Sequence, residues 1–155
     1  MGADRVEQLG RVQLFAGLGP EALELVARAT TEEAHPIGTL IFRHGDPGEK
    51  LYLILEGRVR ISRDVPGMGE EALAVLGPGD VFGEMSLLDD SPRSADARVH
   101  ERCQLLALSR DGFEDLLFLH KDLAYEVLWS VVRMLTQRLR ETNDKLTFLS
   151  ISGKF

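Results

Sequence analysis

The spacing of apolar positions changes twice along this chain of 155 residues. Up to about residue 35, the apolar residues recur with the loose periodicity of helices. Pro20 and Glu21 suit the first turn of one such helix, and Pro36 blocks any continuation. We therefore expect an N-terminal helical segment that ends near residues 34–36.

Between residues 38 and 109, short β-rich runs alternate with glycine-containing turns. The runs predicted as strands are residues 39–42, 50–55, 58–62, 72–76, 95–99 and 103–108. Many short strands at this spacing indicate a roll or jelly roll, here of about eight antiparallel strands.

Helical spacing returns at residue 110, where a short helix precedes a longer one predicted from about Asp122 to Thr147. Apolar positions of the longer helix recur at intervals of three, four and seven residues: Leu128, Val131, Val132, Leu135, Leu139 and Leu146. This stripe is wider than one face of a β-roll requires. The helix is therefore a candidate for a two-fold seam between two copies of the chain.

These regions together predict one domain over residues 1–155, of the class mainly β with flanking α. An antiparallel β-roll or jelly roll at about residues 36–109 follows the N-terminal helices. The C-terminal helices occupy about residues 111–148, and a short helical turn lies within the roll after residue 83.

Composition narrows the function classes. The net charge is −7, from 18 basic and 25 acidic residues, which disfavours binding to nucleic acid or anionic lipid. No apolar run is long enough to span a bilayer, and the charged N-terminus is not a secretory signal. One cysteine, Cys103, allows no internal disulfide. We expect a cytoplasmic protein without membrane or direct nucleic-acid contacts.

Catalytic and metal chemistry find little support in the sequence. The four histidines are scattered, and none forms a close pair on one strand with a carboxylate nearby, so we expect no metal site. Cys103 has no nucleophile–base pattern around it and fits a small buried apolar residue. We therefore expect no enzymatic activity.

Candidate binding chemistry concentrates in Phe82-Gly83-Glu84-Met85-Ser86-Leu87-Leu88, followed by Ser91-Pro92-Arg93-Ser94-Ala95. Gly83 lets the backbone approach a ligand closely, and the helical turn after it offers amides that can hold an anion. Turn amides and Arg93 together make a phosphate site. Because Glu84 would repel a phosphate, we expect it to accept a hydrogen bond from a sugar hydroxyl. Phosphate and sugar side by side predict a nucleotide.

This segment resembles the phosphate-binding cassette of cyclic nucleotide-binding domains, and the resemblance extends over about residues 14–146. It implies that Glu84 bonds the ribose 2′-hydroxyl and that Arg93 bonds the cyclic phosphate. The amides of residues 85, 86 and 94 would complete the phosphate cradle. The remaining ligand-binding positions implied by the motif are Gly83, Met85, Ser86, Ser94 and Ala95.

The resemblance also has implications for which base the nucleotide carries and for how the domain passes on its signal. By register, Thr142 and Asn143 match a polar pair that bonds adenine in bacterial cAMP regulators, where the second residue comes from the partner subunit. This match favours cAMP and a homodimer through the helix at 122–147. Ser94 is compatible with cGMP, which stays open as a ligand. Family transcription regulators continue into a winged helix-turn-helix, which we do not find here, so we expect an unknown effector protein to read the C-terminal helix.

Two other classes stay open beside this sensor reading. The same roll would serve as a nucleotide-free scaffold or dimerisation module, which predicts no ligand and a pocket closed by its own side chains. A small jelly-roll enzyme is disfavoured because no acid–base pair or metal cluster appears. Apart from the ligand, cAMP or cGMP, the sequence implies no cofactor.

Overall fold

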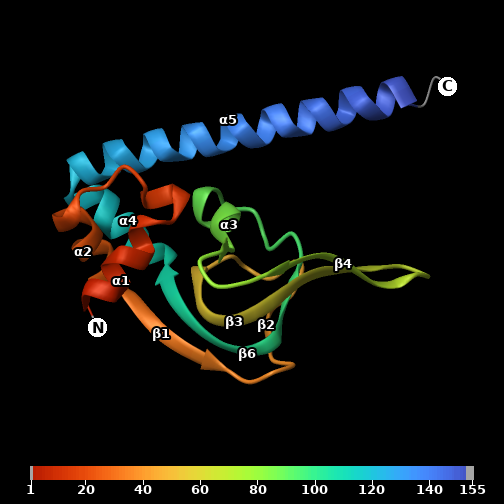
Figure 1. Cartoon of the computed structure of the whole chain (residues 1–155), viewed down its shortest axis with the longest axis horizontal. Helices are drawn as coiled ribbons and strands as arrows, with labels where there is room; N and C mark the ends of the chain where they lie inside the picture. The colour runs from red at the N-terminus through yellow and green to blue at the C-terminus, as the bar shows by residue number, and fades with distance from the viewer. Residues whose placement is uncertain (1, 153–155) are drawn as a thin grey trace.

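The structure is a computed structural model that describes residues 2–152 and, from residue 4 onward, every side chain in that range except that of Ser86. Its helices and strands follow the order α1 (Gly2–Gly10), η1 (Gln13–Phe15), α2 (Pro20–Ala29), β1 (Thr30–His35), β2 (Leu40–Phe42), β3 (Lys50–Val65), β4 (Gly69–Leu76), β5 (Val81–Phe82), α3 (Glu84–Leu88), β6 (Asp96–Ser109), α4 (Arg110–Leu119) and α5 (Lys121–Ser152). An antiparallel sheet is thus flanked by N-terminal helices and by a long C-terminal helix (Figure 1), as the sequence predicts.

The sheet is built around two long bent strands, β3 and β6. Its order is β1-β6-β3-β4, with β2 added to β6 and β5 added to β3, and every pairing is antiparallel. Over the described residues it has six strands, fewer than the eight or so predicted. The difference arises because residues 50–65 form one strand and residues 96–109 form another, where the sequence predicted two strands each.

Gly57 explains why β3 continues where a turn was expected. Its φ is +88°, and a Cβ placed on it would lie 2.1 Å from the carbonyl oxygen of Arg102 on β6. The β3–β6 register shifts on both sides of this residue, which identifies a bulge. Glycine here therefore bends two paired strands together instead of ending one of them.

Residues 30–35 correct another expectation, because they were predicted to continue the N-terminal helix. α2 ends at Ala29, and the Thr30 hydroxyl donates a 2.6 Å hydrogen bond to the Ala27 carbonyl there. The next six residues pair with β6 from Thr30 opposite Leu108 to His35 opposite Cys103. Long-range pairing with an apolar strand overrides the local helical signal, and the two β-branched threonines favour it.

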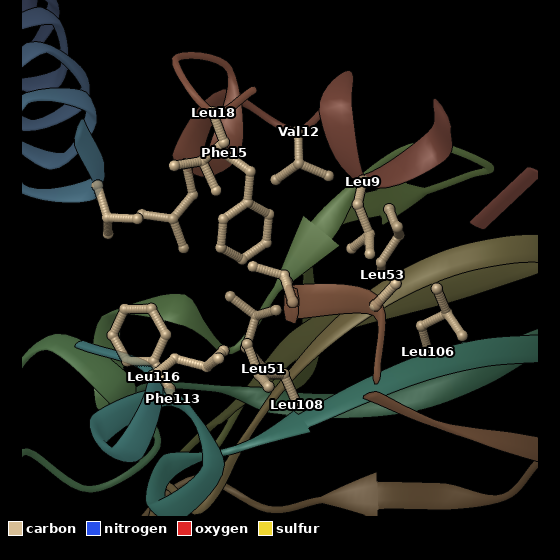
Figure 2. Close-up of a cluster of buried hydrophobic side chains, with 14 of the residues drawn as sticks. Leu9, Val12, Phe15, Leu18, Leu51, Leu53, Leu106, Leu108, Phe113 and Leu116 are labelled. Carbon is tan, nitrogen blue, oxygen red and sulfur yellow. The ribbon is translucent and has the colours of Figure 1, made fainter. Parts of the chain in front are cut away.

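Two hydrophobic clusters lie on opposite faces of β3, because alternate side chains of a strand point to opposite sides. Leu51 and Leu53 pack beneath the helices against residues such as Phe15 and Phe113 (Figure 2). Tyr52 and Ile54 instead face the interior of the roll, where they join a second cluster. Four members of that second cluster line the cavity described below: Phe42, Ile61, Leu76 and Phe82.

α5 runs past α3 and continues well beyond the N-terminal helices (Figure 1). Its side chains are exposed from residue 135 to residue 152. The only tryptophan of the chain, Trp129, lies on this helix with its ring 6.4 Å from that of Tyr125 and with Arg133 stacked above it at 5.8 Å. No helix among residues 2–152 is both long enough and apolar enough to cross a membrane.

Candidate nucleotide site

A cavity of about 240 Å³ opens into the roll beside α3. Its lining combines the apolar roll interior with the predicted motif: Phe42, Ile61, Ala74, Leu76, Val81, Phe82, Gly83, Glu84, Met85, Arg93, Ser94 and Ala95. A larger hollow of about 740 Å³ lies between the start of α2 and the corner joining α4 to α5. Arg93 is the only buried charged side chain among the described residues, and it faces the smaller cavity, so we place the candidate site there.

Arg93 is buried to 4% exposure without a carboxylate partner among the described residues. Its Nη1 donates to the Gly83 carbonyl at 3.0 Å and its Nη2 to the Lys50 carbonyl at 2.6 Å. Its guanidinium carbon lies 4.1 Å above the Phe42 ring, and its Nε has no hydrogen-bond partner in the described part of the chain. Burial lowers the pKa of this guanidinium, and nearby Tyr52 is the largest influence in the other direction. A buried cation left in this state favours an anion at its side.

Gly83 fixes the position of this arginine. The residue is the N-cap of α3 and has a φ of +82°. A Cβ on it would lie 2.6 Å from the Nη1 of Arg93 and 2.9 Å from the Lys50 carbonyl oxygen. Only glycine therefore leaves room for the guanidinium while turning the chain into α3, whose first amides have no partner within the helix.

Glu84 begins α3 and contacts α5. Its side chain is 14% exposed, and its Oε1 accepts a 2.5 Å hydrogen bond from the Nη2 of Arg138. The Nη1 of the same arginine lies 3.1 Å from the sulfur of Met85. The residue expected to bind a ribose hydroxyl is thus already ion-paired to the long C-terminal helix.

The family model described as "Cyclic nucleotide-binding domain" matches residues 32–120, which is more than half of the chain. The chain belongs to the cyclic nucleotide-binding domain family. The matched range contains the whole cavity motif and both long strands of the roll.

Individual relatives agree with this assignment. The chain is 44% identical over 137 residues to the cyclic AMP receptor protein of Thermus thermophilus, covering 88% of this chain and 62% of that protein. It is 32% identical over 151 residues to a CRP-like cAMP-activated global transcriptional regulator of Mycobacterium tuberculosis, covering 96% and 66%. The chain thus spans just under two thirds of the length of these two relatives.

A solved structure supports the fold over nearly the same length. The N-terminal domain of a transcriptional regulator from Streptomyces coelicolor superposes with a TM-score of 0.79 at 36% identity, covering 90% of this chain and 94% of that one. Its helices and roll therefore correspond to almost all the elements described here.

Within this cyclic nucleotide-binding domain, the structure gathers most of the predicted site residues and separates two. Gly83, Glu84, Met85, Arg93, Ser94 and Ala95 all line the cavity. Ser86 lies in the middle of α3, but its side chain is outside the described residues. Thr142 and Asn143 are exposed on the outer half of α5 and do not line the cavity of a single chain. Their contact with a base stays a prediction, in which Asn143 would come from a second chain.

Sequence reasoning missed two features, Arg138 and an aromatic cluster of Phe42, Tyr52 and Phe82, of which Phe42 and Phe82 line the cavity. Tyr52 stacks on Phe82 with ring centroids 5.0 Å apart, and Phe42 lies tilted against both at 6.0–6.3 Å. Burial raises the pKa of the Tyr52 hydroxyl. Arg138 precedes Thr142 by one helical turn, and this spacing is the only sequence signal that points to it. Residues 2–152 contain no cluster of His, Cys, Asp and Glu suited to a metal ion.

Proposed function

We propose that this domain is a cyclic nucleotide sensor that favours cAMP and signals through α5. One observation carries the proposal: a buried arginine without a carboxylate partner faces the same cavity as a carboxylate at the start of a short helix. A cyclic nucleotide offers an anionic phosphate to the first group and a ribose hydroxyl to the second. An uncharged ligand would leave the Arg93 guanidinium without an anion, and a purely anionic ligand would offer no hydroxyl to the Glu84 carboxylate.

Recognition in this proposal divides along the cavity. Arg93 binds the cyclic phosphate together with the amides of residues 85, 86 and 94, and Glu84 accepts the hydrogen bond of the ribose 2′-hydroxyl. The apolar wall of Ile61, Ala74 and Leu76 offers surface for the base. The name of the Thermus relative favours cAMP over cGMP, which stays possible because Ser94 is exposed beside the phosphate position.

The ion pair between Glu84 and Arg138 supplies the route to the output. A ribose hydroxyl at Glu84 has to share this carboxylate with Arg138, so ligand binding and the position of α5 are energetically linked. The pair is partly buried, with 14% exposure at Glu84 and 45% at Arg138, so salt screens it only partly. An effector protein would read the resulting change in α5.

Exposed apolar residues along α5 support a homodimer as part of the same proposal. Seven of them are between 40% and 63% exposed and repeat at alternating intervals of three and four residues: Tyr125, Leu128, Val132, Leu135, Leu139, Leu146 and Leu149. Thr142 occupies the remaining position of this repeat, which we call the α5 seam. A strict repeat of this kind is typical of a two-stranded coiled coil. In such a dimer, Thr142 and the neighbouring Asn143 would reach the base from the two helices.

The proposal describes a regulatory module of the cytoplasm that performs no catalysis. We assign it no contact with membranes and, within these 155 residues of net charge −7, none with nucleic acid. Its ligand is cAMP or cGMP, and it uses no metal.

Calorimetric titration tests the proposal. The protein is unfolded and refolded to remove bound small molecules, refolding is verified by circular dichroism, and cAMP and cGMP are titrated separately. We expect saturable binding of one nucleotide per chain, with cAMP the tighter ligand. Absence of heat with both nucleotides, confirmed by equilibrium dialysis, would contradict the sensor and favour the alternative, a nucleotide-free dimerisation module built on the exposed α5 seam.

A further inference from the structure

Arg110, the first residue of α4, reaches back to the end of the cassette helix α3. Its Nη1 donates a 2.7 Å hydrogen bond to the Asp90 carboxylate, and its Nη2 donates to the carbonyl of Asp89. Asp89 is the C-cap of α3, where the last carbonyls of a helix have no partner within it. The side chain of Arg110 is only 24% exposed although Asp90 is fully in solvent. Arg110 therefore acts on the backbone at the end of α3 as well as on a surface carboxylate.

This contact lies between the two ends of the predicted nucleotide site. Glu84 is held at the start of α3 by Arg138. Arg93 is held by backbone hydrogen bonds to the 45–46 turn, from its N–H to the Asp46 carbonyl and to its carbonyl from the Gly45 N–H, both 2.8 Å long. Arg110 holds the stretch between these two points. Arg110 thus contacts residues 89 and 90, which lie between Glu84 and Arg93 in the chain.

Arg110 also shares its anchor with the phosphate-binding arginine. Its backbone N–H donates to the Glu49 carbonyl at 2.8 Å, and the Nη2 of Arg93 donates to the carbonyl of the adjacent residue, Lys50. The first turn of α4 and the guanidinium of Arg93 are therefore attached to neighbouring peptide groups at the start of β3. The side chain of Arg110 contacts residues 89 and 90 at the end of α3, and its backbone begins α4, so one residue connects the two helices.

We propose that Arg110 is a positioning residue for nucleotide binding. It sets the separation of Glu84 and Arg93 through the end of α3, and it transmits displacement of α3 to α4, which packs against α5. The inference rests on the proposed function, since it concerns how the same site is held. It adds a second route from the site to the C-terminal helices, independent of the ion pair between Glu84 and Arg138.

The first experiment compares cAMP affinity by calorimetry in the full chain and in four variants. We expect Arg110→Ala to weaken binding about tenfold, the size of one charge-assisted hydrogen bond. Arg110→Lys, which keeps the charge and a donor, should recover to within about threefold of wild type. Asp90→Asn should weaken cAMP binding about twofold or less, because the Asp90 carboxylate that pairs with Arg110 is exposed to solvent. Arg102→Ala, an exposed arginine on β6, is the matched control and should leave affinity unchanged.

A second readout separates positioning from mere stabilisation. Hydrogen exchange of the amides of α3 and α4 is measured with and without saturating cAMP. In wild type we expect the ligand to slow exchange in both α3 and α4, whereas in Arg110→Ala the protection of α4 should be lost while that of α3 remains. If Arg110→Ala folds poorly, the two milder variants still test the role. Arg110→Lys should weaken cAMP binding by up to about threefold and Asp90→Asn by about twofold or less.

The outcomes distinguish this inference from the function on which it rests. Wild-type affinity and wild-type protection of α4 in Arg110→Ala would overturn the positioning role alone. Failure of the wild-type protein to bind either nucleotide would overturn the sensor, and the role of Arg110 with it.

Discussion

The two ends of the proposed site differ in how completely one chain builds them. The end at Arg93 is assembled from three separate segments. Arg93 meets Phe42 and Lys50 of the 42–50 region and Gly83 through contacts of 2.6–4.1 Å. The end at Thr142 lies on a helix whose residues 139–152 are exposed and make no described hydrogen bond or ion pair to another element. The proposed phosphate end is thus prepared within one chain, whereas the proposed base end would depend on assembly with a second copy.

Replacing the arginine at the prepared end should have the largest effect. We expect Arg93→Ala to weaken cAMP binding at least about a hundredfold, because hydrogen bonds to a charged group contribute about 1.5–3 kcal/mol each. The ligand-free protein should remain folded, since the substitution removes a buried charge that has no carboxylate partner. Calorimetry and thermal unfolding check both statements. Unchanged affinity would remove the phosphate role from Arg93.

Gly83→Ala tests whether the prepared end depends on backbone geometry. The new Cβ would crowd the Nη1 of Arg93, and a positive φ costs a residue with a side chain about 1–2 kcal/mol. We expect lower stability by about that amount and cAMP binding weakened about tenfold or more, because Arg93 must move. Gly38→Ala is the matched control, since Gly38 has a similar φ of +85° with nothing within 4 Å of its Cβ. Gly38→Ala should lower stability but leave the affinity for cAMP unchanged. Equal affinities in the two variants would contradict the steric argument.

Leu139→Ala tests whether a second copy completes the other end. Leu139 is 61% exposed in one chain, so truncation should leave the fold of the single chain intact. Burying a leucine contributes about 1.5–3 kcal/mol, and a dimer loses two of them, so we expect its dissociation constant to rise at least about tenfold. Sedimentation equilibrium measures this change, with Arg140→Ala, one position off the α5 seam, as the control. A wild-type chain that stays monomeric at high concentration would remove the α5 seam from the proposal.

Thr142→Ala should have the smallest effect. A neutral hydrogen bond contributes a net 0.5–1.5 kcal/mol or so, which corresponds to about two- to tenfold weaker cAMP binding. Binding of cGMP should change less, and the difference should disappear in the Leu139→Ala background at concentrations where the chain is monomeric. Thr147→Ala, on the same exposed half of α5, should leave both ligands unaffected. Loss of cAMP affinity in the monomer as well would show that Thr142 does not need a partner.

The sequence predicts the local parts of this molecule better than its long-range ones. Gly83, Glu84 and Arg93 occur in one short segment, and their placement around a cavity follows from a glycine turn and a short helix. Arg138 lies 54 residues from Glu84, and its contact depends on the direction in which α5 leaves α4, which no local pattern encodes. The helix predicted for residues 30–35 is wrong for the same reason, because these residues pair with the distant strand β6.

The bulge at Gly57 marks an intermediate case. The glycine is visible in the sequence and correctly indicates a local irregularity, but the choice between a turn and a bulge depends on Arg102 across the sheet. A residue type therefore predicts a backbone conformation, while the neighbouring strand decides its consequence.

The position of Trp129 has a practical consequence. It is the only indole in the chain, lies on α5 between Tyr125 and Arg133, and is 47% exposed. Its fluorescence therefore reports the surroundings of one helix without interference from another tryptophan or the need for a dye. Emission would respond both to covering of α5 by a second copy and to rearrangement of Arg133 above the ring, and dilution separates the two. Trp129 is therefore an intrinsic fluorescent probe of α5, the helix through which we propose that the domain signals.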